Sequence, residues 1–307
     1  MSSELEIRRV GQGILVRYRG IRYGLDKVKS GLDVDYNLIS HAHYDHLPTR
    51  ARGRIYASRE TIGLARIRGM RYYNIVEDLK DVEIFETGHI LGSTAFLIEG
   101  KILYTGDINN NDRIFLKRFR PPQADILIIE ATYGSPEYIF GEFRNQVNTL
   151  LRFISRNMVQ GRNIVLRAYP LGKPQIISLI LKKVKNLYVS RRVARYNKAY
   201  SDLLKMEIPN RVFNGNEVDE PFILLAASNE KIDMLDRYEP VEAILSGWTL
   251  KFGGGLPISD HADYKGLIEV VDRVSPKKIY TIYGHSKRLA SILKEYGYDA
   301  IDLREAK

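Results

Sequence analysis

Apolar and polar residues alternate near the start of the chain, in short runs separated by turn residues. The apolar members of these runs are Leu5, Ile7, Val10, Ile14, Val16, Tyr18, Ile21 and Tyr23. Alternation is the pattern of a strand with one buried face, so residues 4–40 are expected to form an antiparallel sheet that ends in Leu38-Ile39-Ser40. Further strands are expected at 82–86, 94–98, 101–105 and 125–130. The last of these contains an unbroken apolar run, which is typical of a strand covered on both faces.

The apolar spacing changes after Gly134-Ser135-Pro136. Helical spacing then follows at Phe143, Val147, Leu150, Leu151 and Ile154. A strand at 163–166, a helix at 173–185, a strand at 186–189 and a helix at 191–204 continue an α/β alternation of the parallel type. We therefore predict one domain formed by residues 1–140 and 246–307 and a second, inserted domain at 141–245. Glycines at 253–255 are expected to make a flexible joint, and strand pattern returns at Ile258 and at 279–282.

The composition is that of an ordinary globular protein, with 307 residues of which 44% are hydrophobic and 27% charged. Cysteine is absent, which excludes disulfides and thiolate metal sites. The first residues are acidic where a signal peptide would be apolar, and no stretch approaches the roughly 18 apolar residues of a membrane span. We expect a cytoplasmic protein that does not associate with a membrane. The sequence is compatible with a homodimer.

The net charge of +10 is concentrated in one part of the chain. Residues 144–211 contain fifteen lysines and arginines but only two acidic residues, Asp202 and Glu207. Such segregation is typical of a module that binds a polyanion. The alternative is that these lysines and arginines only solvate exposed helix faces, and composition alone does not decide between the two interpretations.

The chain has six histidines, and three of them lie within residues 41–46 together with Asp45. Imidazole and carboxylate are the ligands that Zn²⁺ prefers when no thiolate is present. His89 follows the strand expected at 82–86, and Asp107 ends another expected strand with a carboxylate placed to bridge two ions. Two metal ions about 3.5 to 4 Å apart are typical of enzymes that cleave phosphodiesters.

The order of these residues resembles the metallo-β-lactamase fold, in which two sheets pack between layers of helices. The matching residues are Asp26, His41, His43, Asp45, His46, His89 and Asp107. The strings at 124–134, 171–175 and 259–263 resemble the β-CASP nucleases of that superfamily. The resemblance implies an α/β fold, a metallo-β-lactamase αββα sandwich, with a β-CASP α/β cap domain inserted at 141–245.

The resemblance also implies roles for individual residues. The first of two zinc ions per chain would be held by His41, His43 and His89. The second would be held by Asp45 and His46, and Asp107 would bridge the two. The implied catalytic residues are Asp45 and an acid pair, in which His261 protonates the leaving oxygen and Glu130 orients His261. Asp26 would orient a ligand imidazole from behind, although it could also be only a turn residue after Gly24.

The last ligand position departs from the family pattern. In RNA-cleaving members a histidine follows the final strand and binds the second zinc, whereas here Tyr283 stands at that place and His285 follows two residues later. DNA-cleaving members lack that histidine. Either His285 reaches the second zinc, or water and substrate complete the shell. We favour His285 as a ligand because it is the one histidine without another role.

A two-zinc site in the same chain favours the interpretation that the basic segment, residues 144–211, binds nucleic acid. Its candidate contacts to nucleic acid are Lys173, Arg191, Arg192, Arg195 and Lys198. Three nearby tyrosines could stack on unpaired bases or could be helix-core residues, namely Tyr188, Tyr196 and Tyr200. Lys173 could equally be an ordinary exposed lysine.

The sequence therefore predicts a zinc-dependent nuclease that hydrolyses single-stranded nucleic acid, RNA slightly favoured over DNA, by two-metal activation of water. Its partner would be RNA or single-stranded DNA. The alternatives are a DNA exonuclease of the repair type and a non-catalytic nucleic-acid-binding subunit. A small-molecule hydrolase of the same fold would not need a basic segment. An iron redox enzyme is disfavoured because Asp45 and His46, together with an acid–base histidine, are the arrangement of a hydrolase.

Overall fold

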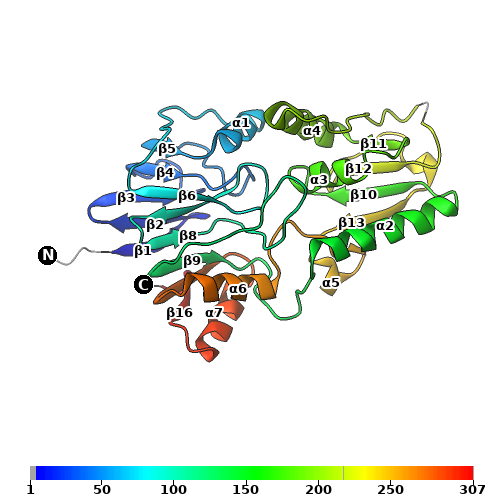
Figure 1. The fold of residues 1–307 in the computed structure, drawn as a ribbon. Helices are drawn as coiled ribbons and strands as arrows, with labels where there is room; N and C mark the ends of the chain where they lie inside the picture. Colours follow the sequence, from blue (N-terminus) through cyan, green and yellow to red (C-terminus); the bar gives the residue numbers. More distant parts are fainter. Residues whose placement is uncertain (1–4, 217, 307) are drawn as a thin grey trace. The chain divides into compact units, whose positions relative to one another are not determined.

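The computed structural model describes residues 5–216 and 218–306, and the chain divides into two compact units (Figure 1). Unit 1 comprises residues 1–136 and 261–307, and unit 2 comprises residues 137–260. Unit 2 is thus an insertion into unit 1. The sequence-based boundary at 245 differs from the observed one, because β14 (Gly255–Leu256) pairs in parallel with β13 (Val241–Leu245) of unit 2. The glycines expected to form a joint lie in and beside this strand.

The first sheet of unit 1 has five strands in sequence order. They are β1 (Glu6–Val10), β2 (Gly13–Tyr18), β3 (Ile21–Leu25), β4 (Tyr36–Leu38) and β5 (Arg54–Tyr56). The first three pair antiparallel, as predicted. The prediction is wrong from β4 onward, since β4 pairs in parallel with both β3 and β5. Residues 26–35 form a crossover that returns the chain to its starting edge, as parallel pairing requires.

The second sheet of unit 1 has six strands in the order β16-β15-β9-β8-β7-β6. They are β6 (Val82–Glu86), β7 (Thr94–Ile98), β8 (Ile102–Tyr104), β9 (Ile126–Glu130), β15 (Lys278–Ile282) and β16 (Ala300–Asp302). The strands predicted at 82–86, 94–98, 101–105, 125–130 and 279–282 are confirmed within two residues at each end. Central β9 is buried on both faces, as its unbroken apolar run predicts.

Alternate residues of the second sheet enter two different cores. Phe96 and Ile128 face the first sheet, whereas Leu97 and Leu127 face helices α6 (Tyr264–Val274) and α7 (Ser286–Glu295). Helix α1 (Arg59–Ile67) covers the outer face of the first sheet. Unit 1 is therefore a four-layer sandwich of helix, sheet, sheet and helix, which confirms the predicted α/β class.

Unit 2 is built on a parallel sheet in the order β11-β12-β10-β13-β14, which confirms the predicted parallel alternation. Its other strands are β10 (Ile164–Ala168), β11 (Leu187–Val189) and β12 (Ile223–Ala227). Its helices are α2 (Phe143–Val159), α3 (Lys173–Ile180), α4 (Arg191–Leu204), α5 (Thr249–Phe252) and a 3₁₀ turn, Asp236–Tyr238. Helix α3 ends five residues earlier than predicted, because turns lead from Leu181 into β11.

No helix in the described ranges has both the length and the apolar character needed to cross a membrane.

Candidate metal centre

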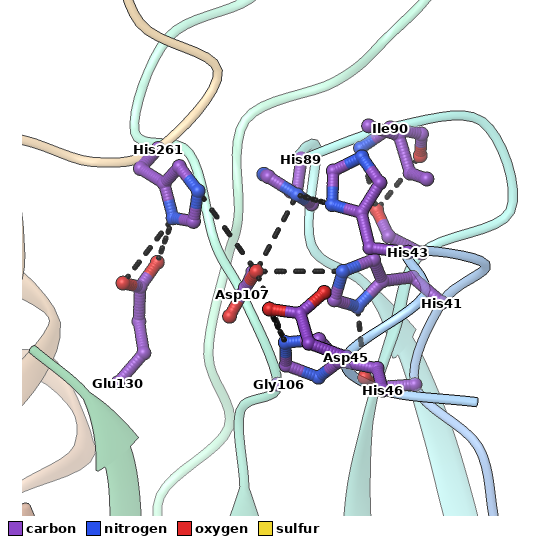
Figure 2. Close-up of polar contacts among 12 residues, drawn as sticks. His41, His43, Asp45, His46, His89, Ile90, Gly106, Asp107, Glu130 and His261 are labelled. Atoms are coloured by element: carbon purple, nitrogen blue, oxygen red, sulfur yellow. Dashed lines mark hydrogen bonds and ion pairs between the residues drawn. The ribbon is translucent and has the colours of Figure 1, made fainter. Parts of the chain in front are cut away.

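Most of the predicted metal-binding and catalytic residues of unit 1 lie at one edge of the second sheet (Figure 2). Strands β6, β8 and β9 point the same way, so the residues at their carboxyl ends meet. His89 follows β6, Asp107 follows β8 and Glu130 ends β9. The loop at 41–46 follows β4 of the first sheet, and His261 precedes α6. The topology therefore brings together side chains that are far apart in the sequence.

Four of these residues form a group that could hold a metal ion. The ligand atoms of His41, His43, His89 and Asp107 all lie within 4.8 Å of one another, and all four side chains are buried. Oδ2 of Asp107 lies 3.4 Å from Nε2 of His41 and 3.5 Å from Nε2 of His89. Three imidazole nitrogens and one carboxylate are a donor set suited to Zn²⁺.

The imidazole of His41 supports this assignment. Its Nε2 is buried and has no hydrogen-bond partner among the residues that the structure describes. Burial and the neighbouring histidines hold the pKa of His41 well below its usual range, so the ring is neutral and carries a lone pair. A buried lone pair without a partner is costly, and a cation at this point would satisfy it. The residues present therefore fit a metal ion.

His46 and Asp45 lie on the other side of Asp107. Nε2 of His46 is 3.5 Å from Oδ2 of Asp107 and 3.8 Å from Oδ2 of Asp45. The side chain of Asp45 is 70% exposed, so this group is more open than the first. One oxygen of Asp107 thus lies between His41 and His46, which is where a carboxylate bridging two ions would have to lie.

Asp26 organises the imidazoles from behind. Its buried carboxylate accepts hydrogen bonds from His46 Nδ1 at 2.7 Å, from Tyr104 Oη at 2.5 Å, and from the backbone N and Oγ of Ser40 at 2.6 and 2.7 Å. Oγ of Ser40 is also 2.9 Å from His41 Nδ1. Since Oγ donates to Asp26, it accepts from His41, and Nε2 of His41 stays the acceptor. One carboxylate therefore fixes two predicted ligands.

The same carboxylate affects the charge of His46. Burial lowers the pKa of His46, but the negative charges of Asp107 and Asp26 outweigh this and raise it to about 10. Burial also raises the pKa of Asp107, to about 7. The backbone of Asp26 has a φ of 56°, in the left-handed region. Asp26 is thus a turn residue that also supports the site.

We expect Asp26→Asn to weaken zinc binding about 10- to 100-fold, because a neutral amide cannot accept from Ser40, Tyr104 and His46 together. The zinc dissociation constant, measured by competition with a chromogenic chelator, checks this. Asp33→Asn is the matched control, since Asp33 is exposed and pairs with Arg22. Equal affinities for the two variants would contradict a supporting role for Asp26.

Glu130 and His261 form the predicted pair. Nδ1 of His261 lies 3.0 and 3.3 Å from the two oxygens of Glu130, and its Nε2 lies 3.9 Å from Oδ2 of Asp107. Glu130 is fully buried and also accepts from the backbone N of Ile108 and of Thr132. Burial opposes its ionisation, but the charge and hydrogen bond of His261 outweigh this and lower the pKa of Glu130. Asp107, Glu130 and His261 also lie close enough to hold an ion themselves.

The structure corrects the expectation for the last ligand position. The ring of Tyr283, not that of His285, lies beside the site, with its centroid 5.2 Å from that of His46. The Tyr283 hydroxyl donates to the Gln12 carbonyl at 3.2 Å. His285 precedes helix α7, lines a separate hollow with Arg288, and belongs to no metal-binding group among the described residues. Tyr283 has a φ of 64°, a left-handed turn that changes which side chain faces the site.

Sequence reasoning did not identify Ser40 or Tyr104. Each is a hydroxyl residue in a buried segment that leads to a predicted ligand. A buried hydroxyl needs a hydrogen-bond partner, and this need was the one feature of the sequence that could have pointed to Ser40 and Tyr104.

The candidate contacts to nucleic acid in unit 2 have different environments. Arg191, Arg192, Arg195 and Lys198 are exposed along α4. Lys173 is buried instead, and its ammonium group donates to the carbonyl of Leu245 at 3.1 Å and pairs with Asp260 at 3.0 Å. Lys173 is therefore neither an exposed lysine nor presented to a phosphate.

The three tyrosines of the basic segment are buried, with at most 8% of their surface exposed: Tyr188, Tyr196 and Tyr200. The interpretation that they stack on bases is wrong, and the alternative that they are helix-core residues is confirmed for Tyr196 and Tyr200. Helix α4 buries Tyr196 and Tyr200 on one face and exposes its cations on the other, whereas Tyr188 lies in strand β11.

Comparison with known proteins finds relatives among nucleic-acid enzymes. No family model matches the chain. A probable DNA ligase of Opitutus terrae is 26% identical over 286 residues, which cover 86% of this chain and 28% of the ligase. An RNase J-like protein of Methanocaldococcus jannaschii is 31% identical over 204 residues, which cover 55% of this chain and 47% of that protein. Endoribonuclease YSH1 of Saccharomyces cerevisiae is 32% identical over 124 residues, which cover 38% of this chain and 15% of YSH1. The chain spans less than half the length of each.

Solved structures share the fold of this chain. A protein of unknown function from Enterococcus faecalis V583 superposes with a TM-score of 0.64 at 14% identity, covering 93% of this chain and 95% of that one. The homologues of this chain are metallo-β-lactamase β-CASP nucleases, as the resemblance in the sequence predicts.

Proposed function

We propose that this protein is a zinc-dependent nuclease that hydrolyses single-stranded nucleic acid, with RNA favoured over DNA. The observation that carries the proposal is the position of Asp107. Oδ2 of this one buried carboxylate lies within 3.9 Å of His41, His46, His89 and His261. Ligands suited to zinc and a candidate proton donor therefore surround the same atom.

Two zinc ions per chain would share Asp107. The first would be held by His41, His43 and His89, and the second by Asp45 and His46. Bound zinc supplies a Lewis acid for a phosphoryl oxygen and makes water nucleophilic at neutral pH.

The remaining residues position and move a proton. Glu130 binds Nδ1 of His261 and so turns Nε2 toward Asp107. A proton on Nε2 would be delivered to the leaving oxygen as the phosphodiester bond breaks, and the buried charge of Glu130 would stabilise the imidazolium until then. Asp26 and Ser40 hold the predicted ligands in place, so they need not reorganise during the reaction.

The substrate assignment rests on the relatives and on charge. The names of an RNase J-like protein and of an endoribonuclease support RNA. The exposed cations of α4 support a polyanionic substrate, and the insertion of unit 2 into unit 1 supports its assignment as a cap. A second candidate is a DNA exonuclease of the repair type, favoured by similarity to the Opitutus terrae ligase over 86% of this chain. The set of candidate ligands argues against a non-catalytic subunit.

An assay on end-labelled single strands tests the proposal. RNA and DNA of matched sequence, each with a 5′-phosphate or a 5′-hydroxyl, are incubated with zinc-loaded protein, with chelator-treated protein and with the treated protein after zinc is restored. We expect RNA cleavage that chelation abolishes and zinc restores, because the nucleophile depends on the metal.

The control is His43→Ala, which removes one predicted ligand. Cleavage of DNA alone would favour the repair exonuclease. Binding of nucleic acid without cleavage, with zinc present, would favour the non-catalytic subunit. If His43→Ala cuts as the wild type does, the proposed metal site is wrong.

A further inference from the structure

A hollow of about 440 Å³ opens on the surface of unit 1. It is lined by Phe85 and Glu86 at the end of β6 and by Asp112, Lys117, Arg118 and Arg120 on the segment after β8. This volume falls within the range of about 300 to 1,000 Å³ that is typical of ligand sites.

The wall of the hollow is joined to the metal centre. Arg113 donates from its guanidinium group to the carbonyls of Gly88 and His89 and so ties the segment after β8 to a predicted zinc ligand. Gly88 has a φ of 71°, and a side chain there would collide with the Lys117 carbonyl. The backbone that carries Lys117 and Arg118 therefore lies directly against the loop that carries His89.

The cations of the hollow have no protein partners among the described residues. Lys117, Arg118 and Arg120 are exposed, and none of the three forms an ion pair within the described ranges, whereas Lys277 and Lys278 of the same unit are paired with aspartates. The nearby carboxylate of Asp112 accepts from the backbone N of Arg118 instead of its guanidinium group. Three charges that can reach a ligand thus remain along one wall.

Phe85 adds an aromatic surface to the same hollow. Its ring is half-buried and packs against the core between the second sheet and α6, so the core restricts its movement. Aromatic rings bind unpaired bases by stacking without regard to sequence, and cations beside them bind the connecting phosphates. The hollow combines both features within reach of the proposed catalytic centre.

We propose that this hollow binds the part of a single strand that flanks the phosphate being cut. Lys117, Arg118 and Arg120 would contact its phosphates, and Phe85 would stack on a base. Glu86 and Asp112 partly offset the three cations, so a free small anion would bind weakly. A single strand already bound at the metal centre would bind the hollow more tightly, because its flanking part is then present there at a high effective concentration. This inference rests on the proposed nuclease function.

Binding is measured by fluorescence anisotropy of a labelled single strand at several salt concentrations, in zinc-loaded His261→Ala protein to prevent turnover. We expect Lys117→Ala with Arg118→Ala to reduce the slope of log K against log salt by about 1.4, since each lost phosphate contact removes about 0.7. Lys80→Ala with Lys101→Ala removes the same charge at the opposite end of the second sheet and is the matched control. Phe85→Leu should weaken binding about 5- to 150-fold at an unchanged slope.

Equal slopes for the two double variants would overturn the proposal, as would unchanged affinity of Phe85→Leu. Hydrolysis of bis(p-nitrophenyl) phosphate separates the hollow from the catalytic function, because this small diester lacks the flanking nucleotides that the hollow is proposed to bind. With His261 intact, the Lys117 and Arg118 double variant should hydrolyse it at the wild-type rate. A wild type inactive on every diester would refute the nuclease, and the anisotropy slopes would still decide whether the hollow binds a strand.

Discussion

Asp107→Asn is expected to reduce phosphodiester hydrolysis by at least about 10³-fold, which corresponds to about 4 kcal/mol of transition-state stabilisation. Oδ2 of Asp107 lies 3.4 to 3.5 Å from His41, His46 and His89, so its negative charge is shared by both proposed zinc sites. Asparagine keeps the shape of the side chain and removes the charge. We therefore expect the variant to fold and to lose bound zinc.

Zinc content measured by elemental analysis, together with the rate on labelled RNA, checks this prediction. Asp125→Asn is the control, because Asp125 is a partly exposed carboxylate that pairs with Lys277. Its rate and zinc content should match those of the wild type. Two zinc ions retained by Asp107→Asn would show that this carboxylate does not bridge them.

His261→Ala is expected to reduce the rate about 10²- to 10⁴-fold while zinc content stays unchanged. The reason is the distance of 3.9 Å between His261 Nε2 and Asp107, together with the bond of 3.0 Å between Nδ1 and Glu130. These contacts suit a proton donor that lies beside the metals. The measurement is zinc content and single-turnover rate on the same preparation.

Glu130→Gln provides the companion variant. Glutamine can still accept from the backbone N of Ile108, but it lacks the negative charge that pairs with His261. We expect Glu130→Gln to retain its zinc and to lose less of the rate than His261→Ala does. If both variants instead lose one zinc ion, then Asp107, Glu130 and His261 hold a metal and the acid–base assignment is wrong.

The alternation of apolar residues was enough to predict most strands of unit 1, because a strand with one buried face repeats every two residues. The direction of β4 could not be predicted, since direction depends on the path of residues 26–35 and not on the strand itself. The end of the insertion was misplaced for a similar reason. A strand as short as β14 leaves no periodic signal, and its place is set by pairing with β13.

The candidate site was predictable where chemistry and topology agreed. His89, Asp107 and Glu130 each stand at the end of a strand, and parallel strands gather such residues at one edge. Spacing could not choose between Tyr283 and His285, because the left-handed turn at Tyr283 decides which one faces His46. Lys173 was misjudged because its partner, Asp260, lies 87 positions further along the chain.

The insertion of unit 2 has a consequence for the order of folding. The pair Glu130 and His261 is separated by 131 positions, and the paired residues of β9 and β15 are 152 positions apart. Closing so long a loop is entropically costly and slow. Within unit 2, however, the backbone N of Ser259 donates to Oε1 of Gln146, which draws the two ends of the insertion together. If unit 2 folds first, this bond shortens the loop that β9 and β15 must close, and it brings His261 closer to Glu130 before their contact forms.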